Sequence, residues 1–480
     1  MPNDGDMALV HEVPVRTLPI ERLEPVIGRE RYEQLTSVGK RLRNELGDRT
    51  IWNINSTAVG GGVAEMLQVL VGYVADTGIR IRWDTITGDP AFFAITKRLH
   101  NQLHGVLGPS GPLDAADARH YEEVLAANVS ELLTQVKHGD IAILHDPQTA
   151  GMTEALTRAG VKVVWRCHVG IDEQDDTSRA AWEFLRPYLA LAHGYVFTRK
   201  QFAPLWVPRA RLFVIQPSID PYSPKNVDLE PADIRAILAT IGVSDDPGAG
   251  HKGHFLRSDG SLGVVRRPAM VTEEGRPRPA DKVLAQVSRW DRLKDMTGVM
   301  DGFAKYVLPE PDTYLVLAGP SVSEVADDPE GAMVFAECRD RWHQLPREAR
   351  ERVLLVTLPL DDVEENAAMV NAIQRRATVI AQKSLAEGFG LTVAEGMWKG
   401  RPVIGSAVGG IVDQIAPGTG ILLPDPKDLA AFGDDVRWLL DHPDEADKMG
   451  AAGKEHIREH FVGNVHLLKF AEVVGPLIAD

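Results

Sequence analysis

Cysteine and long apolar runs are both scarce in this sequence. Only Cys167 and Cys338 occur in 480 residues, and their spacing does not suit a metal site. A chain of this length hardly needs disulfides, so a disulfide-stapled fold and a cysteine-based zinc site are excluded. No apolar stretch approaches the ~20 residues that span a bilayer, and residues 1–30 lack the apolar region of a secretory signal. We therefore expect a soluble, cytoplasmic protein.

Positive charge is also in short supply. The sequence has 52 Lys and Arg against 68 Asp and Glu, which gives a net charge of −16. Nucleic-acid backbones and anionic membranes both attract a positive surface, so neither is expected as a general partner. Anionic small molecules stay possible, because a few local cations can hold a diphosphate inside an acidic protein. A homodimer is left open as the assembly.

The signatures of several common enzyme classes are absent. The sequence contains no HExxH, GxSxG or CxxC motif. Acidic pairs such as residues 361–362 lie in polar surroundings and lack the spacing of metal ligands. We therefore expect no obligatory metal or other cofactor, with Mg²⁺ at most stimulatory.

The pattern that is present is an alternation of short apolar runs with longer amphipathic stretches. Buried strands separated by helices indicate a parallel sheet covered on both faces. At 480 residues the chain is too long for one core. The expected strands of the first half are residues 50–55, 79–85, 140–145, 162–167, 194–198 and 212–215, and those of the second half are 283–287, 313–318, 353–357, 378–381 and 402–404.

Prolines interrupt this rhythm near the middle of the chain. Four of them punctuate a polar stretch that we assign as a linker, residues 217–231. The prediction is therefore an α/β protein of two doubly wound, Rossmann-like domains, residues 1–216 and 232–480. Ligands bind beyond the carboxyl ends of strands in such sheets, so two of them can enclose a ligand in a cleft.

Two segments fit this division less simply. Residues 245–281 are rich in Gly, Pro, Asp and Arg and show little periodicity, so we expect an excursion from the second domain, with the arginines at 266 and 267 solvated. The last expected helix, residues 463–477, follows the second domain directly, and its packing against the first domain is left open.

The strongest local signal is a pair of glutamates separated by seven residues, Glu387 and Glu395. Glu387 lies in a glycine-containing loop after an expected strand, and Glu395 lies in the second turn of the following helix. The free N–H groups of the first helical turn favour an anion such as a sugar diphosphate. Alternatively, the carboxylates only complement the helix dipole. The other candidate donor-binding residues of this motif are Gly388, Phe389, Gly390 and Leu391.

Two cations follow an expected strand earlier in the second half, Arg289 and Lys294. A leaving diphosphate gains negative charge as its bond to a sugar breaks, and fixed cations stabilise that charge in the transition state. The planar guanidinium of Arg can donate two parallel hydrogen bonds to a phosphate, whereas the ammonium group of Lys is a compact positive charge. Taken singly, each is more often a solvated surface cation, but the paired glutamates favour a catalytic role.

A glycine-rich turn joins a strand to a helix in the first half, with Gly61 and Gly62 as candidate donor contacts. The turn matches neither the GxGxxG nor the GxxxxGK[ST] spacing, so a dinucleotide site and a P-loop are excluded. It accommodates an anion at a helix N-terminus, or it only allows tight packing.

Polar residues also follow two neighbouring expected strands of the first half. His145, Asp146 and Gln148 come after one, and His168 comes after the other. A single histidine at a strand end is more often structural. Two parallel strands that both end this way favour a sugar-binding edge, with His168 near the transferred sugar and the first three at the acceptor.

Together these residues resemble the retaining GT-B glycosyltransferases of the family that includes sucrose synthase and trehalose phosphorylase. Arg289, Lys294, Glu387 and Glu395 match that family's donor-site pattern of Arg, Lys five residues later, and Glu-x7-Glu. A closer similarity, to the trehalose glycosyltransferring synthases, extends over both halves of the chain. It is carried by residues 52–68, 145–148, 165–168, 217–220 and 387–410.

The resemblance implies a GT-B fold and transfer of glucose from ADP- or UDP-glucose to free glucose, giving trehalose with retained configuration. It also implies that His168 touches the donated glucose, Glu387 its hydroxyls and Gly61–Gly62 the diphosphate, with Asn371 and Gln374 lining the nucleotide pocket. Two alternatives stay open. One is a trehalose phosphorylase that uses inorganic phosphate, and the other is a non-catalytic sugar-nucleotide sensor, which the presence of Arg289, Lys294 and Glu387 disfavours.

Overall fold

A computed structural model describes residues 8–58, 62–108, 111–246, 250–322 and 330–479. The chain divides into two compact units. Unit 1 comprises Met1–Ser218 together with Phe461–Asp480, and unit 2 comprises Ile219–His460. The C-terminal helix thus belongs to the same unit as the first half of the chain, and residues 219–230 belong to unit 2.

Unit 1 is built on a seven-stranded sheet. Its order is β1-β3-β2-β4-β5-β6-β7, with β1 antiparallel to β3 and every other pair parallel. Two strands at its centre, β4 and β5, are buried almost throughout, which is why they read as continuous apolar runs. The strands are β1 (Val10–Glu12), β2 (Ile51–Asn55), β3 (Ile81–Ile86), β4 (Ile141–His145), β5 (Lys162–Cys167), β6 (Gly194–Phe197) and β7 (Leu212–Val214).

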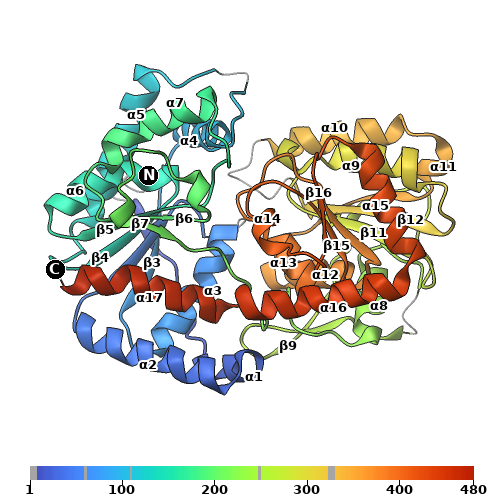
Figure 1. Ribbon diagram of the computed structural model, residues 1–480, viewed down its shortest axis with the longest axis horizontal. Coiled ribbons are helices and arrows are strands. Elements are labelled where there is room, and N and C mark those ends of the chain that lie inside the picture. The colour runs from blue at the N-terminus through green and yellow to red at the C-terminus, as the bar shows by residue number, and fades with distance from the viewer. Residues whose placement is uncertain (1–7, 59–61, 109–110, 247–249, 323–329, 480) are drawn as a thin grey trace, which may run out of the picture. The chain divides into compact units, whose positions relative to one another are not determined.

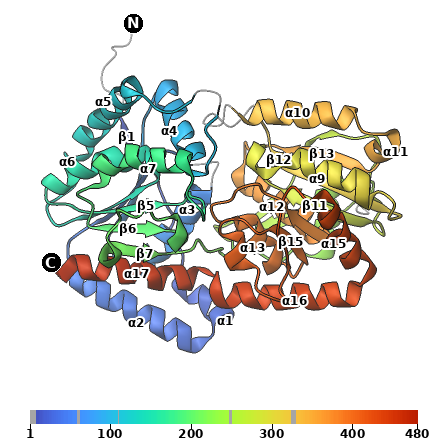
Figure 2. The ribbon, with the colours of Figure 1, turned by 45° about the horizontal axis from the view of Figure 1, so that its top comes forward.

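Helices cover both faces of this sheet. In Figures 1 and 2, α4, α5 and α7 lie on one side, and α2 and α17 run alongside each other on the other. Short polar caps begin several of them. Asp89 accepts from Phe92 N before α4, and Asp175 forms a capping box with Ser178 at the start of α7. The helices are α1 (Glu24–Ile27), α2 (Arg29–Leu46), α3 (Gly62–Asp76), α4 (Pro90–Leu103), α5 (Ala115–Leu132), α6 (Thr153–Arg158), α7 (Asp176–Leu189) and α17 (Gly463–Ala479).

Unit 2 repeats the plan with a second seven-stranded sheet. Its order is β10-β13-β12-β11-β14-β15-β16, and only β10 is antiparallel to its neighbour. The predicted α/β class with two doubly wound, Rossmann-like sheets is therefore confirmed. The strands are β10 (Met270–Thr272), β11 (Lys282–Val287), β12 (Thr313–Pro320), β13 (Val353–Leu358), β14 (Val379–Gln382), β15 (Val403–Ser406) and β16 (Ile421–Leu423).

The helices of unit 2 again flank the sheet. Residues of α9, α10 and α15 share one buried core with the strands, whereas α8 packs against α12. None of the described helices is long and apolar enough to cross a membrane. The helices are α8 (Pro231–Thr240), α9 (Met296–Gly302), α10 (Gly331–His343), α11 (Arg347–Arg350), α12 (Val363–Arg376), α13 (Leu391–Trp398), α14 (Ile411–Gln414), α15 (Leu429–Asp441) and α16 (Pro443–His460).

The segment expected as an excursion has regular structure in its described part. It forms a hairpin, β8 (His254–Leu256) with β9 (Leu262–Val264), and then contributes the edge strand β10 to the sheet. Arg266 and Arg267 are both exposed, as expected, but the pattern did not indicate that Arg267 also pairs with a carboxylate. Its Nη1 lies 3.0 Å from Glu365 Oε2, and the backbone N–H groups of Arg266 and Arg267 both donate to Glu365 Oε1. Strands this short carry almost no periodicity, which explains why the pattern missed them.

Each sheet reverses its strand order at one point. In unit 1 the reversal lies between β2 and β4, and in unit 2 it lies between β11 and β14. Loops leaving adjacent strands on opposite sides create a crevice at the carboxyl ends of those strands. Most candidate site residues of both halves follow these strands, and His168 follows β5, the neighbour of β4.

Candidate active site

In unit 2, the loops after β11 and β14 bring a lysine and a glutamate together. Lys294 Nζ donates to Glu387 Oε2 at 2.5 Å, and Ser384 Oγ donates to the same oxygen at 3.2 Å. The side chains of Lys294 and Glu387 are 14% and 11% exposed. These two predicted residues, 93 positions apart, thus form a largely buried ion pair where the strand order reverses.

The backbone around Lys294 is held by a second ion pair. Asp295 adopts a left-handed conformation, with φ of 48°, and its side chain accepts from Gly298 N at the start of α9. The buried Lys383, directly after β14, pairs with Asp295 and donates to Pro426 O at 2.7 Å. Neither Asp295 nor Lys383 was a sequence candidate. Their pairing joins the two loops that carry Lys294 and Glu387.

Arg289 lies on the loop between β11 and Lys294. Its side chain is 38% exposed, and its Nη2 lies 3.5 Å from Asp291 Oδ2. The loop ends in a short 3₁₀ turn, Arg292–Lys294, which begins where Asp291 accepts from Leu293 N at 2.8 Å. Arg289 is thus placed on the same loop as Lys294, and it is far more open to solvent.

A glycine-dependent loop leads from Glu387 into α13. Gly390 has φ of 85°, and a Cβ there would lie 3.2 Å from Glu387 Cγ. The loop after β15 closes on it, since a Cβ on Gly409 would lie 1.7 Å from Glu387 O. Gln414 Nε2 donates to Phe389 O at 2.5 Å. Only glycine allows this approach. The loop contains the predicted donor-binding residues Glu387, Gly388, Phe389 and Gly390, and Leu391 begins the helix.

Glu395 is buried on α13, with 3% of its surface exposed. Its Oε2 accepts from Gln374 Nε2 at 3.4 Å, and its Oε1 lies 3.6 Å from Lys225 Nζ. The buried Lys399 Nζ donates to Glu395 O at 3.2 Å, and burial lowers the pKa of Lys399 below its usual value. Neither lysine was a sequence candidate. Glu395 therefore lies in a buried polar cluster.

Asn371 lies next to this cluster on α12, and its side-chain amide donates hydrogen bonds to backbone carbonyl groups. Its Nδ2 donates to Pro224 O at 3.0 Å and to Val227 O at 2.8 Å. The amide thereby anchors the proline-rich stretch that we expected as a linker. Its contacts with residues 224–227 give it a structural role in this chain.

In unit 1, the ends of β4 and β5 bring two histidines together. The rings of His145 and His168 stack with centroids 5.5 Å apart, and His145 Nδ1 lies 3.2 Å from His168 Nε2. Burial, and next the nearby Arg166 guanidinium, lower both histidine pKa values well below the usual 6.5. Both rings are therefore neutral at physiological pH.

Asp146 sits between these strands with a strained backbone, at φ of 62°. Its Oδ1 accepts from His168 N at 2.7 Å. Burial raises its pKa to about 7, against the opposing charge of Arg166. Arg166 in turn donates to His466 Nε2 at 2.9 Å, so α17 contributes to this cluster. Positive φ at a non-glycine residue is uncommon and costs energy, and residues strained in this way cluster at functional sites.

The remaining candidates of unit 1 are Gln148, Gly61 and Gly62. Gln148 is in the 3₁₀ helix Pro147–Met152, and its Oε1 is buried with no hydrogen-bond partner among the described residues. Gly62 is the first residue of α3, and Gly61 lies outside the described residues. A buried acceptor without a partner suits a ligand hydroxyl.

Comparison with known proteins gives the following similarities. Residues 53–204 match the family described as "Trehalose synthase, N-terminal domain", and residues 272–456 match "Glycosyl transferases group 1". A trehalose synthase of Rubrobacter xylanophilus is 35% identical over 440 residues, or 91% of this chain and 92% of that protein. A trehalose phosphorylase of Grifola frondosa is 24% identical over 93% of this chain and 59% of its own length.

Solved structures are similar in fold. A UDP-forming α,α-trehalose-phosphate synthase of Burkholderia xenovorans, solved with glucose-6-phosphate, has a TM-score of 0.65 and 14% identity. The match covers 89% of this chain and 99% of that structure. At this identity the likeness concerns the fold, and it extends over both units.

Proposed function

Since the chain belongs to the trehalose synthase family, we propose that it is a hexosyltransferase that forms trehalose from a nucleoside-diphosphate glucose and free glucose. The observation that carries the proposal is the buried Lys294–Glu387 pair at the strand-order reversal of unit 2. A fixed cation at that place suits a departing diphosphate.

On the donor side, each group has a proposed task. Lys294 and Arg289 neutralise the diphosphate, and the N-terminus of α13 adds partial positive charge through the N–H groups after Gly390. Glu387 accepts hydrogen bonds from hydroxyls of the transferred glucose. Glu395 accepts from the ribose diol of the nucleotide, either ADP- or UDP-glucose.

On the sugar side, the neutral histidines and the buried acceptors suit an uncharged ligand. His168 binds the transferred glucose, and His145, Asp146 and Gln148 bind the acceptor glucose. Gln148 Oε1, buried and without a partner among the described residues, supports this assignment. Neutral polar groups bind sugar hydroxyls without the cost of burying a charge.

The proposed reaction proceeds with retention on one face of the glucose. The bond from C1 to the diphosphate oxygen breaks, and a bond from C1 to an acceptor hydroxyl oxygen forms. The proton of that hydroxyl passes to the departing diphosphate oxygen. Charge therefore develops on the diphosphate, beside Lys294 and Arg289, and stabilising it lowers the barrier. The chemistry requires no carboxylate nucleophile and no obligatory metal.

The second candidate is a trehalose phosphorylase, favoured by the 24% identical phosphorylase relative. The fold and cations are equally suited to inorganic phosphate as the glucosyl acceptor from trehalose. The two activities differ in the product made from trehalose. Phosphate gives glucose 1-phosphate, whereas ADP or UDP gives a nucleotide sugar.

A donor and acceptor panel tests the proposal. ADP-, UDP-, GDP- and TDP-glucose are each incubated with glucose, and trehalose is identified by chromatography and its α,α configuration by NMR. We expect trehalose with ADP- or UDP-glucose, and the nucleotide sugar in the reverse reaction. Glucose 1-phosphate from trehalose and phosphate, with no product from any nucleotide sugar, would establish the phosphorylase instead.

A further inference from the structure

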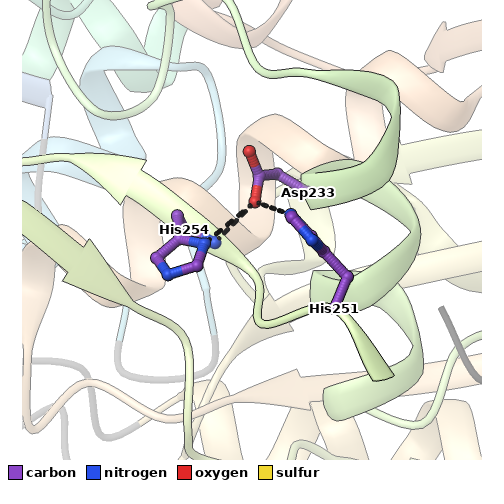
Figure 3. A group of neighbouring side chains, drawn as sticks. All are labelled: Asp233, His251 and His254. Carbon is purple, nitrogen blue, oxygen red and sulfur yellow. Dashed lines mark hydrogen bonds and ion pairs between the residues drawn. The ribbon is translucent and has the colours of Figure 1, made fainter. Parts of the chain in front are cut away.

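Two histidines and an aspartate converge beside α8 in unit 2, and none of them is among the residues assigned to transfer. Asp233 lies in the first turn of α8, and His251 and His254 come from the chain entering β8. Asp233 Oδ1 lies 2.9 Å from His251 Nε2 and 3.4 Å from His254 Nδ1. Figure 3 shows both imidazole rings turned toward this carboxylate.

The spacing of these donor atoms suits a metal ion. One atom from each residue lies within 4.8 Å of the other two. Ligands ~2.0–2.1 Å from a tetrahedral Zn²⁺ lie roughly 3.3 Å from one another, close to the 2.9 and 3.4 Å separations found here. Imidazole nitrogen and carboxylate oxygen are ligands typical of zinc and its neighbours in the first transition row. We propose that Asp233, His251 and His254 bind a divalent transition-metal ion, Zn²⁺ in particular.

The surrounding chain holds the three side chains in place. The backbone N–H of His254 donates to Asp233 Oδ1 at 2.9 Å, which fixes the carboxylate. Gly253 presses the loop against α8, since a Cβ there would lie 2.5 Å from Ile237 Cγ1 and 3.0 Å from Ile237 N. The close approach of loop and helix explains why histidines three residues apart both reach Asp233. Contacts from groups that do not themselves touch the ion orient the side chains that bind it.

Exposure increases from the carboxylate to the outer histidine. The side chain of Asp233 is 15% exposed, that of His254 31% and that of His251 41%. An ion can therefore enter from solvent, and water completes its coordination, as it does where a zinc ion has three protein ligands. An ion at this place ties α8 to the β8–β9 hairpin. That hairpin belongs to the 245–281 segment. Arg257, which follows β8, pairs with Asp362 and Glu364 at the start of α12.

The consequence concerns the stability of unit 2. A ligand that binds the folded chain and not the unfolded one raises the unfolding temperature by mass action. The transfer reaction proposed above uses none of the three residues. We therefore expect the ion to stabilise the fold while leaving turnover unchanged, so this inference and the proposed function fail independently.

Zinc titration of the full chain tests the site. Tag-free protein is stripped with a chelator and titrated with Zn²⁺ against a chromophoric competitor, and with Co²⁺ as a spectroscopic probe. We expect one tight equivalent of Zn²⁺, a visible Co²⁺ spectrum of a four- or five-coordinate site, and a higher melting temperature. Absence of a tight equivalent, or of any effect on melting, overturns the proposal.

Variants locate the ion. His251→Ala removes the most exposed ligand, and Asp233→Asn keeps an acceptor for His254 N while removing the anionic ligand. Each is expected to weaken Zn²⁺ binding at least tenfold and to abolish the thermal shift. The matched control is His456→Ala/His460→Ala, which removes a histidine pair on α16 whose ring centroids lie 4.7 Å apart. Equal loss in the control and the site variants would place the ion elsewhere and overturn the assignment.

Discussion

Asn53 Oδ1 lies 3.3 Å from Nε2 of His145, at the centre of the unit 1 sheet. Asn53 Nδ2 donates to Arg82 O, which orients the amide so that its oxygen faces the ring. An amide oxygen only accepts, so His145 carries its proton on Nε2. His145 Nδ1 then accepts from His168 Nε2. This chain leaves Nδ1 of the neutral His168 as an acceptor for a sugar hydroxyl.

The first prediction concerns this hydrogen-bond chain. Asn53→Leu leaves the His145 proton without its acceptor, so we expect kcat/KM for the nucleotide sugar to fall ~10-fold, or about 1.4 kcal/mol. Asn53→Asp restores the acceptor but adds a negative charge, which raises the His145 pKa and shifts the acid limb of the pH–rate profile upward. Steady-state kinetics across pH measure both effects.

The control for Asn53 is another buried asparagine. Asn128 Nδ2 donates to Thr87 O and Val124 O, on the α5 side of unit 1. Asn128→Leu loses a comparable set of hydrogen bonds without touching either histidine. Equal losses of activity in Asn53→Leu and Asn128→Leu, with unaltered pH profiles, would reduce Asn53 to a structural residue.

The second prediction concerns the exposed cation of the donor site. Arg289→Ala removes one of two charges proposed to stabilise the diphosphate, so kcat/KM should fall roughly 10²–10³-fold. Because the side chain is 38% exposed, folding should change little. Arg292 is the matched control, since its guanidinium pairs with Glu330 and Glu337 on the surface. Comparable kcat/KM in the two alanine variants would remove Arg289 from the mechanism.

The third prediction separates the two glutamates. Glu387→Gln keeps the shape but removes the charge that faces Lys294, so kcat should fall about 100-fold while nucleotide affinity survives. Glu395→Gln should instead weaken nucleotide binding about tenfold and largely preserve kcat. Calorimetric titration with ADP or UDP, combined with initial rates, distinguishes them. Identical signatures for both variants would contradict the separate roles of sugar and ribose binding.

The strands and the positions of the loops after them could be predicted from the sequence because burial leaves a direct pattern. Each of the five residues of β4 is buried, and polar residues follow at once. The edge strands β1, β10 and β16 were missed. Each has three residues and at most one of them is buried, so neither length nor alternation distinguishes these strands from loops.

Contacts between residues far apart in the chain could not be predicted in the same way. Arg166 meets His466 across 300 positions, and Lys383 meets Asp295 across 88. No local spacing relates such partners, because the fold alone brings them together. The proximity of Lys294 and Glu387 was expected because both were assigned to one nucleotide-sugar ligand, but the ion pair between them was not predicted.

The fourth prediction follows from the raised pKa of Asp146, about 7 in the folded chain because of burial. Below about pH 4 the carboxyl is protonated in both the folded and unfolded states. Between about pH 4 and 7 the folded chain keeps a proton that the unfolded chain releases, so this group makes stability fall as pH rises. Asp146→Asn has no such titration. Its unfolding free energy relative to the native chain should therefore rise across this window, by on the order of a few kcal/mol, and level off above it.

The melting temperature of Asp146→Asn relative to the native chain should rise in the same way. Thermal unfolding at several pH values measures the difference, and infrared difference spectra report the protonated carboxyl directly. A melting difference that stays constant from pH 4 to 8 would show that Asp146 is ionised in the folded protein throughout, and it would then bind an acceptor hydroxyl as a full negative charge.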